Sequence, residues 1–151
     1  MNTISASPTP PGGPAKPKST PGISLRLWGV LLLVMFLLTS AVGGSLALES
    51  NYLLVTLASH IGLALVTLGL AGYGAAVLGR PYKAPPQAFA GLAALSALLA
   101  TIAGTVFYFG GQSNAALYTM EGFAGLGILV SLLLIVVGGE SGKWTPAGPG
   151  N

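Results

Sequence analysis

The sequence of 151 residues contains no cysteine, a single histidine and few charges. Without thiols the chain cannot form a disulfide framework, a thiolate zinc site, an iron–sulfur cluster or a cysteine nucleophile. Lys, Arg, Asp and Glu make up 6% of the residues, against about 25% in a typical soluble protein. So few charges cannot build a water-facing surface, and a net charge of +3 is too small and too dispersed for nucleic-acid binding. The composition therefore indicates an integral membrane protein.

Four apolar segments are long enough to cross a bilayer, which takes about 20 helical residues. We expect helices over residues 27–47, 52–79, 87–109 and 115–137. Pro85 and Pro86 start the third helix, and the polar break Gly110–Asn114 separates it from the fourth. The predicted fold class is all-α, a four-transmembrane-helix bundle over residues 25–138.

The two ends of the chain differ from this apolar region. Residues 1–24 are rich in Pro, Ser, Thr and Gly, a composition that buries too little apolar surface to offset the entropy of ordering. We expect a disordered N-terminal tail there, and a short C-terminal tail over residues 139–151.

The positions of the cations predict the orientation. All six fall on one side of a four-span chain: Lys16, Lys18, Arg26, Arg80, Lys83 and Lys143. The positive-inside rule then places both termini in the cytoplasm, for a multi-pass protein of the cell membrane. Four aromatic residues at the span ends are expected to be interfacial anchors or lipid-facing bulk: Trp28, Tyr52, Tyr82 and Tyr108.

Small residues recur four positions apart in several spans, a spacing that lets helix backbones approach closely in lipid. The pairs are Ser40/Gly44, Ala58/Gly62, Gly72/Ala76 and Ala100/Gly104. They favour a compact bundle without fixing which helices meet.

His60 and Glu121 are the ionisable groups, other than tyrosine, inside the expected spans. Burying such a group in hydrocarbon costs from about 2.5 to more than 10 kcal/mol, so each needs a partner or a role. Both lie in the outer half of the membrane, where a neutral hydrogen bond between them fits. Alternatively, His60 bonds a carbonyl or hydroxyl of another helix, while Glu121 is a protonated interhelical donor, a proton-handling group or a solvated interfacial residue.

Haem is the cofactor that such a bundle most readily holds, with an imidazole as one axial ligand and methionine or a second histidine as the other. Sliding the chain by 60 positions lays His60 on Met120 and Gly44 on Gly104. We therefore predict His60 as the ligand to a haem b iron and Met120 as its partner in the cofactor site.

The runs Leu38–Gly44 and Ala58–Ala64, joined by an outer loop, resemble a helix-pair repeat of the haem A synthase family, which acts in cytochrome oxidase assembly. The run Tyr118–Gly122 is similar to part of the second pair. The resemblance covers the four spans and is to one four-helix half of the eight-helix proteins or to the short archaeal-type forms. It implies haem binding. That family uses a histidine pair and a glutamate four residues before a ligand histidine, whereas Met120 and Thr56 stand at the matching positions here. These departures favour haem binding over enzyme activity, and no catalytic residue is predicted.

The sequence alone therefore leaves two candidate functions. The first is a b-type haem-binding membrane protein linked to electron transfer in the respiratory chain or to oxidase biogenesis. The second is a cofactor-free structural subunit or assembly factor of a membrane complex. We expect the protein to lie in the lipid bilayer and to associate either with a respiratory membrane complex or with further copies of itself, as a homo-oligomer. No nucleic-acid partner is expected. A transporter or channel is disfavoured because the midplane lacks paired polar residues and the loops are short.

Overall fold

The computed structural model describes residues 24–48, 54–78 and 85–140, which contain helices and turns and no strand. The helices are α1 (Leu25–Leu48), α2 (Leu54–Tyr73), the π-helical segment η1 (Gly74–Leu78), α3 (Pro86–Phe109) and α4 (Asn114–Gly139). Four helical segments, with η1 continuing α2, are long and apolar enough to cross a membrane. The predicted all-α class with four membrane-length helices is therefore confirmed.

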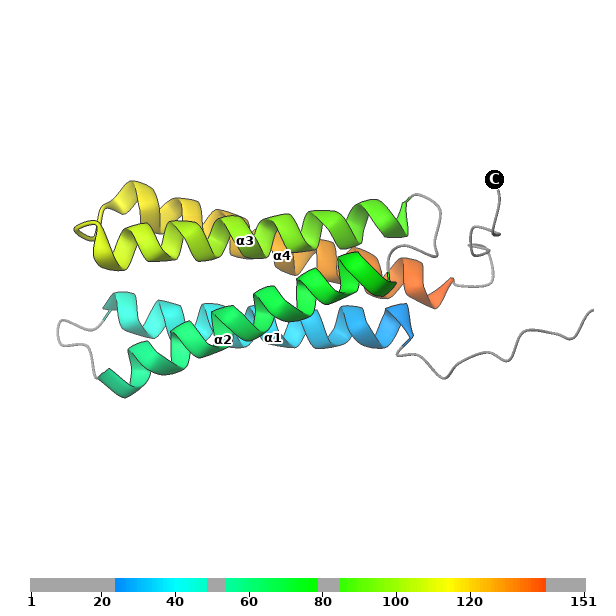
Figure 1. Cartoon of the computed structure of the whole chain (residues 1–151), viewed down its shortest axis with the longest axis horizontal. Coiled ribbons are helices and arrows are strands. Elements are labelled where there is room, and N and C mark those ends of the chain that lie inside the picture. The colour runs from blue at the N-terminus through cyan, green and yellow to red at the C-terminus, as the bar shows by residue number, and fades with distance from the viewer. Residues whose placement is uncertain (1–23, 49–53, 79–84, 141–151) are drawn as a thin grey trace, which may run out of the picture.

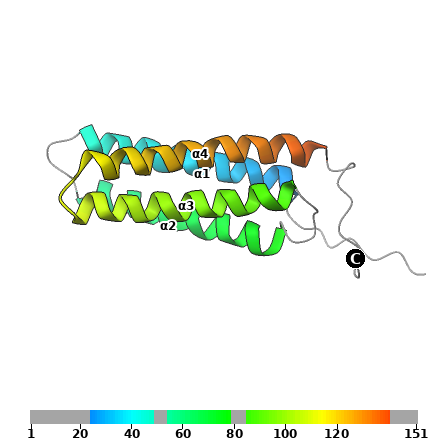
Figure 2. The same cartoon turned by 90° about the horizontal axis from the view of Figure 1, so that it is seen from above.

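The four helices run alternately up and down in one bundle, in which α1 and α3 each pack against both α2 and α4 (Figures 1 and 2). We call the end where α1 begins and α4 ends the tail end, and the opposite end, where α3 meets α4, the loop end. Arg26 lies at the tail end. The other five cations and most of the predicted tails lie outside the described residues, so the cytoplasmic position of the termini stays a prediction.

Local sequence explains where α3 and α4 begin and end. Pro86 occupies the first turn of α3, where a missing backbone N–H costs nothing. After α3 the chain reverses through Gly111 and Gln112, whose φ angles of 98° and 57° lie in the left-handed region. The Ser113 hydroxyl then caps α4 by accepting a hydrogen bond from the Ala116 N–H at 3.2 Å. The polar break predicted from the sequence is thus a tight helix–helix turn.

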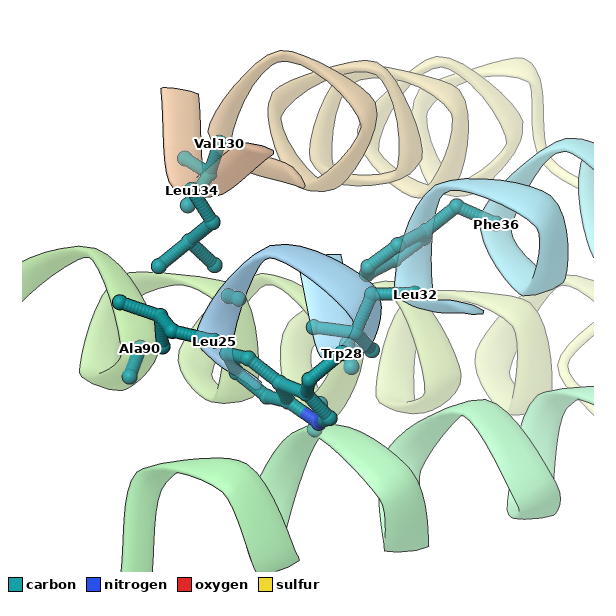
Figure 3. Packing of buried hydrophobic residues seen from close by; sticks show 10 residues of the cluster. Leu25, Trp28, Leu32, Phe36, Ala90, Val130 and Leu134 are labelled. Carbon is teal, nitrogen blue, oxygen red and sulfur yellow. The ribbon is translucent and has the colours of Figure 1, made fainter. Parts of the chain in front are cut away.

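The buried core fills the tail-end half of the bundle, where large side chains of α1 meet small ones of α3 (Figure 3). On α1 these side chains recur every three or four residues and so share one helix face. The core cluster consists of Leu25, Trp28, Leu32, Phe36, Ala71, Ala90, Ala93, Ala97, Val130 and Leu134. The small alanine side chains of α3 leave room for the large side chains of α1 in the centre of the bundle.

Of the glycines that the four-residue spacing singled out, only Gly104 is closely packed, against the Met120 side chain, and the closest helix approaches occur at other glycines. A Cβ added to Gly127 would overlap the Phe36 ring, and one added to Gly138 would lie 2.6 Å from the Arg26 backbone nitrogen. Gly44, Gly62 and Gly72, by contrast, have no atom within 4 Å of the added carbon.

The prediction that Trp28 is an interfacial or lipid-facing residue is wrong. Its side chain is fully buried, and its indole N–H donates a hydrogen bond to the Leu70 carbonyl of α2 at 3.1 Å. An aromatic residue near the end of a span satisfies its N–H equally well inside a bundle, and here core packing provides the partner. Tyr52 and Tyr82 lie outside the described residues.

Candidate functional site

A cavity of about 170 Å³ lies among the four helices in the loop-end half of the bundle. Every helix contributes to its wall, including Ser40 and Gly43 of α1, His60 of α2, Tyr108 of α3 and Met120 of α4. Most of the remaining wall is aliphatic or aromatic. The cavity therefore joins the two predicted cofactor ligands, although α2 and α4 stand at opposite corners of the bundle.

His60 is held in this wall by one specific hydrogen bond. Its side chain is 7% exposed, and its Nδ1 lies 3.1 Å from the Thr39 carbonyl oxygen of α1. Because a carbonyl can only accept, Nδ1 carries the proton, and the neutral imidazole keeps its lone pair on Nε2. This is the arrangement in which histidine ligates a metal, with one ring nitrogen bonded to a protein oxygen and the other left to coordinate.

Gly43 makes this hydrogen bond sterically feasible. It stands four residues after Thr39 on the same helix, so a side chain at that position would lie over the Thr39 carbonyl. A Cβ added to Gly43 would lie 2.6 Å from Cε1 of His60 and 3.1 Å from Nδ1. The imidazole therefore occupies the space that any other residue at position 43 would fill.

The same arrangement recurs with the two helices exchanged. Trp28 of α1 donates to the Leu70 carbonyl of α2, and Gly74 stands four residues after Leu70, where a Cβ would overlap the indole ring. Between the two sites, the hydroxyls of Thr39 and Thr67 lie 3.0 Å apart. Three polar contacts thus join α1 to α2 between Trp28 and Thr39 of α1 and between His60 and Leu70 of α2.

Met120 reaches the cavity at the same depth as His60. Each lies six residues beyond the first residue of its helix, Leu54 or Asn114, which is about 9 Å along the helix axis. A Cβ added to Gly104 of α3 would lie 3.1 Å from the Met120 sulfur. The thioether is therefore packed against a helix backbone beside the cavity.

Glu121 is not brought to His60. Its side chain is exposed on α4, and it is absent from the cavity wall. Successive residues of an α-helix point about 100° apart because there are about 3.6 residues per turn, so Met120 faces inward while Glu121 faces outward. Its predicted interhelical or proton-handling role stays a prediction, and within this bundle His60 bonds Thr39 instead.

Two wall residues were not identified from the sequence as part of the site. The ring of Tyr108 lies edge-on to the imidazole of His60, with centroids 5.8 Å apart and planes at 61°. The Ser40 hydroxyl is buried without a hydrogen-bond partner among the described residues. Ser40 carries a usable signal, because it is a polar residue one turn before Gly44 within an apolar span, whereas the sequence predicted Tyr108 only as an interfacial or lipid-facing aromatic residue.

The donor set limits what metal could bind. A bare metal ion usually takes three or four protein ligands, and the described part of the chain contains no group of three His, Cys, Asp or Glu side chains. A haem iron already has four porphyrin nitrogens and takes only one or two axial ligands from the protein. Of these two cases, the haem needs no more protein ligands than the one imidazole and one thioether that share this cavity wall.

Comparisons with protein-family models, with curated proteins and with solved structures found no match to this chain. The function of the chain is therefore inferred from its four membrane-length helices and the geometry of the cavity.

Proposed function

We propose that this multi-pass membrane protein binds a haem b in the cavity, where Nε2 of His60 and the Met120 thioether would hold its iron. One observation carries the proposal: a histidine whose Nδ1 is already engaged shares a cavity wall, at equal depth, with a methionine from a different helix. When bound, a haem supplies one-electron redox chemistry, in line with a role in respiratory electron transfer or oxidase biogenesis.

The residues of the chain have separate tasks in this proposal. The Thr39 carbonyl fixes the tautomer and orientation of His60, and Gly43 provides the space for the ring. The aliphatic wall excludes water and so lowers the local dielectric around the iron. Methionine ligation raises the reduction potential relative to ligation by two histidines, which predicts an electron-transfer site of comparatively high potential.

The test is to express the full chain with ample haem supply and to measure a pyridine haemochrome and a Soret band. We expect about one haem per chain in the wild type, none in His60→Ala, and retained haem with a lowered potential in Met120→Leu. Ser59→Ala is the matched control, because Ser59 adjoins His60 but is exposed and bonds only the Val55 carbonyl. A wild-type stoichiometry near zero would refute the proposal.

The alternative, a cofactor-free structural subunit, is favoured by a different observation. The bond from His60 to Thr39 already joins α1 to α2 and satisfies the imidazole N–H. In that case wild type would contain no haem, and His60→Ala would lower the stability of the bundle by about 0.6 kcal/mol, the average for a membrane interhelical hydrogen bond.

A further inference from the structure

The residues that line the cavity differ in exposure between the helices. The wall residues of α1 and α4 are all buried or half-buried. The exposed ones belong to α2 and α3: Ile61 at 39%, Leu65 at 57%, Phe109 at 77%, and Thr105. Figure 1 shows the cause, since α2 and α3 lie close together near the tail end and diverge toward the loop end. We call the gap between these four residues the lateral opening.

The lateral opening lies within the membrane-spanning segment. Ile61 and Leu65 follow the first residue of α2 by seven and eleven positions, or about 10 and 16 Å along the axis. The hydrocarbon core of a bilayer is about 30 Å thick. These rim residues therefore face acyl chains, so that a molecule entering between them comes from the lipid.

The side chains of the rim and of the interior indicate what type of ligand fits the cavity. The rim is aliphatic and aromatic except for Thr105, whose hydroxyl is engaged by the Thr101 carbonyl at 2.8 Å. Inside, the buried Ser40 hydroxyl lacks a partner among the described residues, although Thr39, Thr67 and Thr101 each bond a carbonyl one turn earlier. An apolar body with a polar group placed for Ser40 would satisfy both surfaces.

We infer that the cavity is loaded from the bilayer through the lateral opening, and that its ligand is a membrane-dissolved molecule with an apolar body and a polar group that bonds Ser40. Haem b belongs to this class. The inference deepens the proposed function and rests on it only for the identity of the ligand, because the route follows from the exposed wall residues.

The route can be tested without haem. The full chain is placed in phosphatidylcholine vesicles containing a phosphatidylcholine with a photoactivatable diazirine on its acyl chain, and labelled residues are mapped by mass spectrometry. We expect labelling of the half-buried interior residues Ala64 and Ala100. Val130, buried outside the cavity, sets the background. Interior labelling no higher than this background would overturn the lateral opening.

Variants that add a large side chain at the rim test whether the lipid probe enters through the lateral opening. Leu65→Trp on α2 and Thr105→Trp on α3 should each reduce labelling of Ala100 several-fold by narrowing the opening. Leu95→Trp is the control, since Leu95 is exposed on α3 away from the cavity. This variant should change the labelling of Ala100 less than either rim variant does. Equal effects of all three variants would contradict the route.

Added haemin then separates the two proposals. If haem is the ligand, haemin protects Ala64 and Ala100 from the lipid probe and leaves Leu95 labelled. If the interior is labelled but haemin does not protect it, the lateral opening stands and haem is the wrong ligand. Loss of protection in Ser40→Ala, with the rim still labelled, would support the polar contact to the ligand.

Discussion

The contact between Gly43 and His60 yields the sharpest prediction. In Gly43→Ala the new methyl carbon would lie 2.6 Å from Cε1 of His60, well inside van der Waals contact, so the imidazole must move away from Thr39. Gly44→Ala is the matched control, because the carbon added there meets no atom within 4 Å. The two variants change neighbouring residues of one helix in the same way and differ only in what the methyl group meets.

The expected difference follows from three contributions. Both variants gain about 1 kcal/mol of helix propensity, which cancels in the comparison. Gly43→Ala alone incurs overpacking of about 1–3 kcal/mol and loses an interhelical hydrogen bond worth about 0.6 kcal/mol. Gly43→Ala should therefore be less stable than Gly44→Ala by about 2–4 kcal/mol, or about 30- to 700-fold in the unfolding equilibrium constant.

The assay is reversible unfolding in mixed micelles of increasing sodium dodecyl sulfate content, followed by circular dichroism. A double-mutant cycle isolates the contact. In the His60→Ala background the clashing ring is absent, so Gly43→Ala and Gly44→Ala should become equal within about 0.5 kcal/mol. Equal stabilities in the wild-type background, or an undiminished difference without the imidazole, would refute the placement of His60 over Gly43.

Three further predictions follow from the same structure. Reporter fusions at the C-terminus should read cytoplasmic and those at Gly111 external, because the sequence predicts all six cations on one side of the membrane; a translocated C-terminus would contradict the orientation. Gly74→Ala should destabilise the bundle by at least about 1–3 kcal/mol because its methyl would overlap the Trp28 ring, whereas Gly72→Ala, which meets nothing within 4 Å, should not, as micellar unfolding would reveal. Glu121→Gln should leave haem content unchanged, because Glu121 is exposed outside the cavity, and should improve membrane insertion measured by glycosylation mapping; a loss of haem would show that Glu121 acts on the site.

The sequence by itself determined the class of protein and the number of helices. Too few charges for a water-facing surface, together with four long apolar segments, leave the bilayer as the solvent. Pro86 and the turn around Gly111 also act locally, through ring geometry and backbone freedom, so the start of α3 and the reversal into α4 could be predicted without any tertiary contact. The matching depth of His60 and Met120 required only residue counting along helices that enter from the same end.

Only the tertiary structure decided which faces meet. Met120 lines the cavity and Glu121 does not, because a helix turns about 100° per residue and the packing of α4 against its neighbours sets that rotation. Spacing within one helix likewise did not reveal that Gly43 and Gly74 lie beneath the rings of His60 and Trp28. Each lies four residues after a carbonyl that accepts a hydrogen bond from the neighbouring helix. Such a partner is distant in the chain, so it becomes visible only when α1 and α2 are packed together.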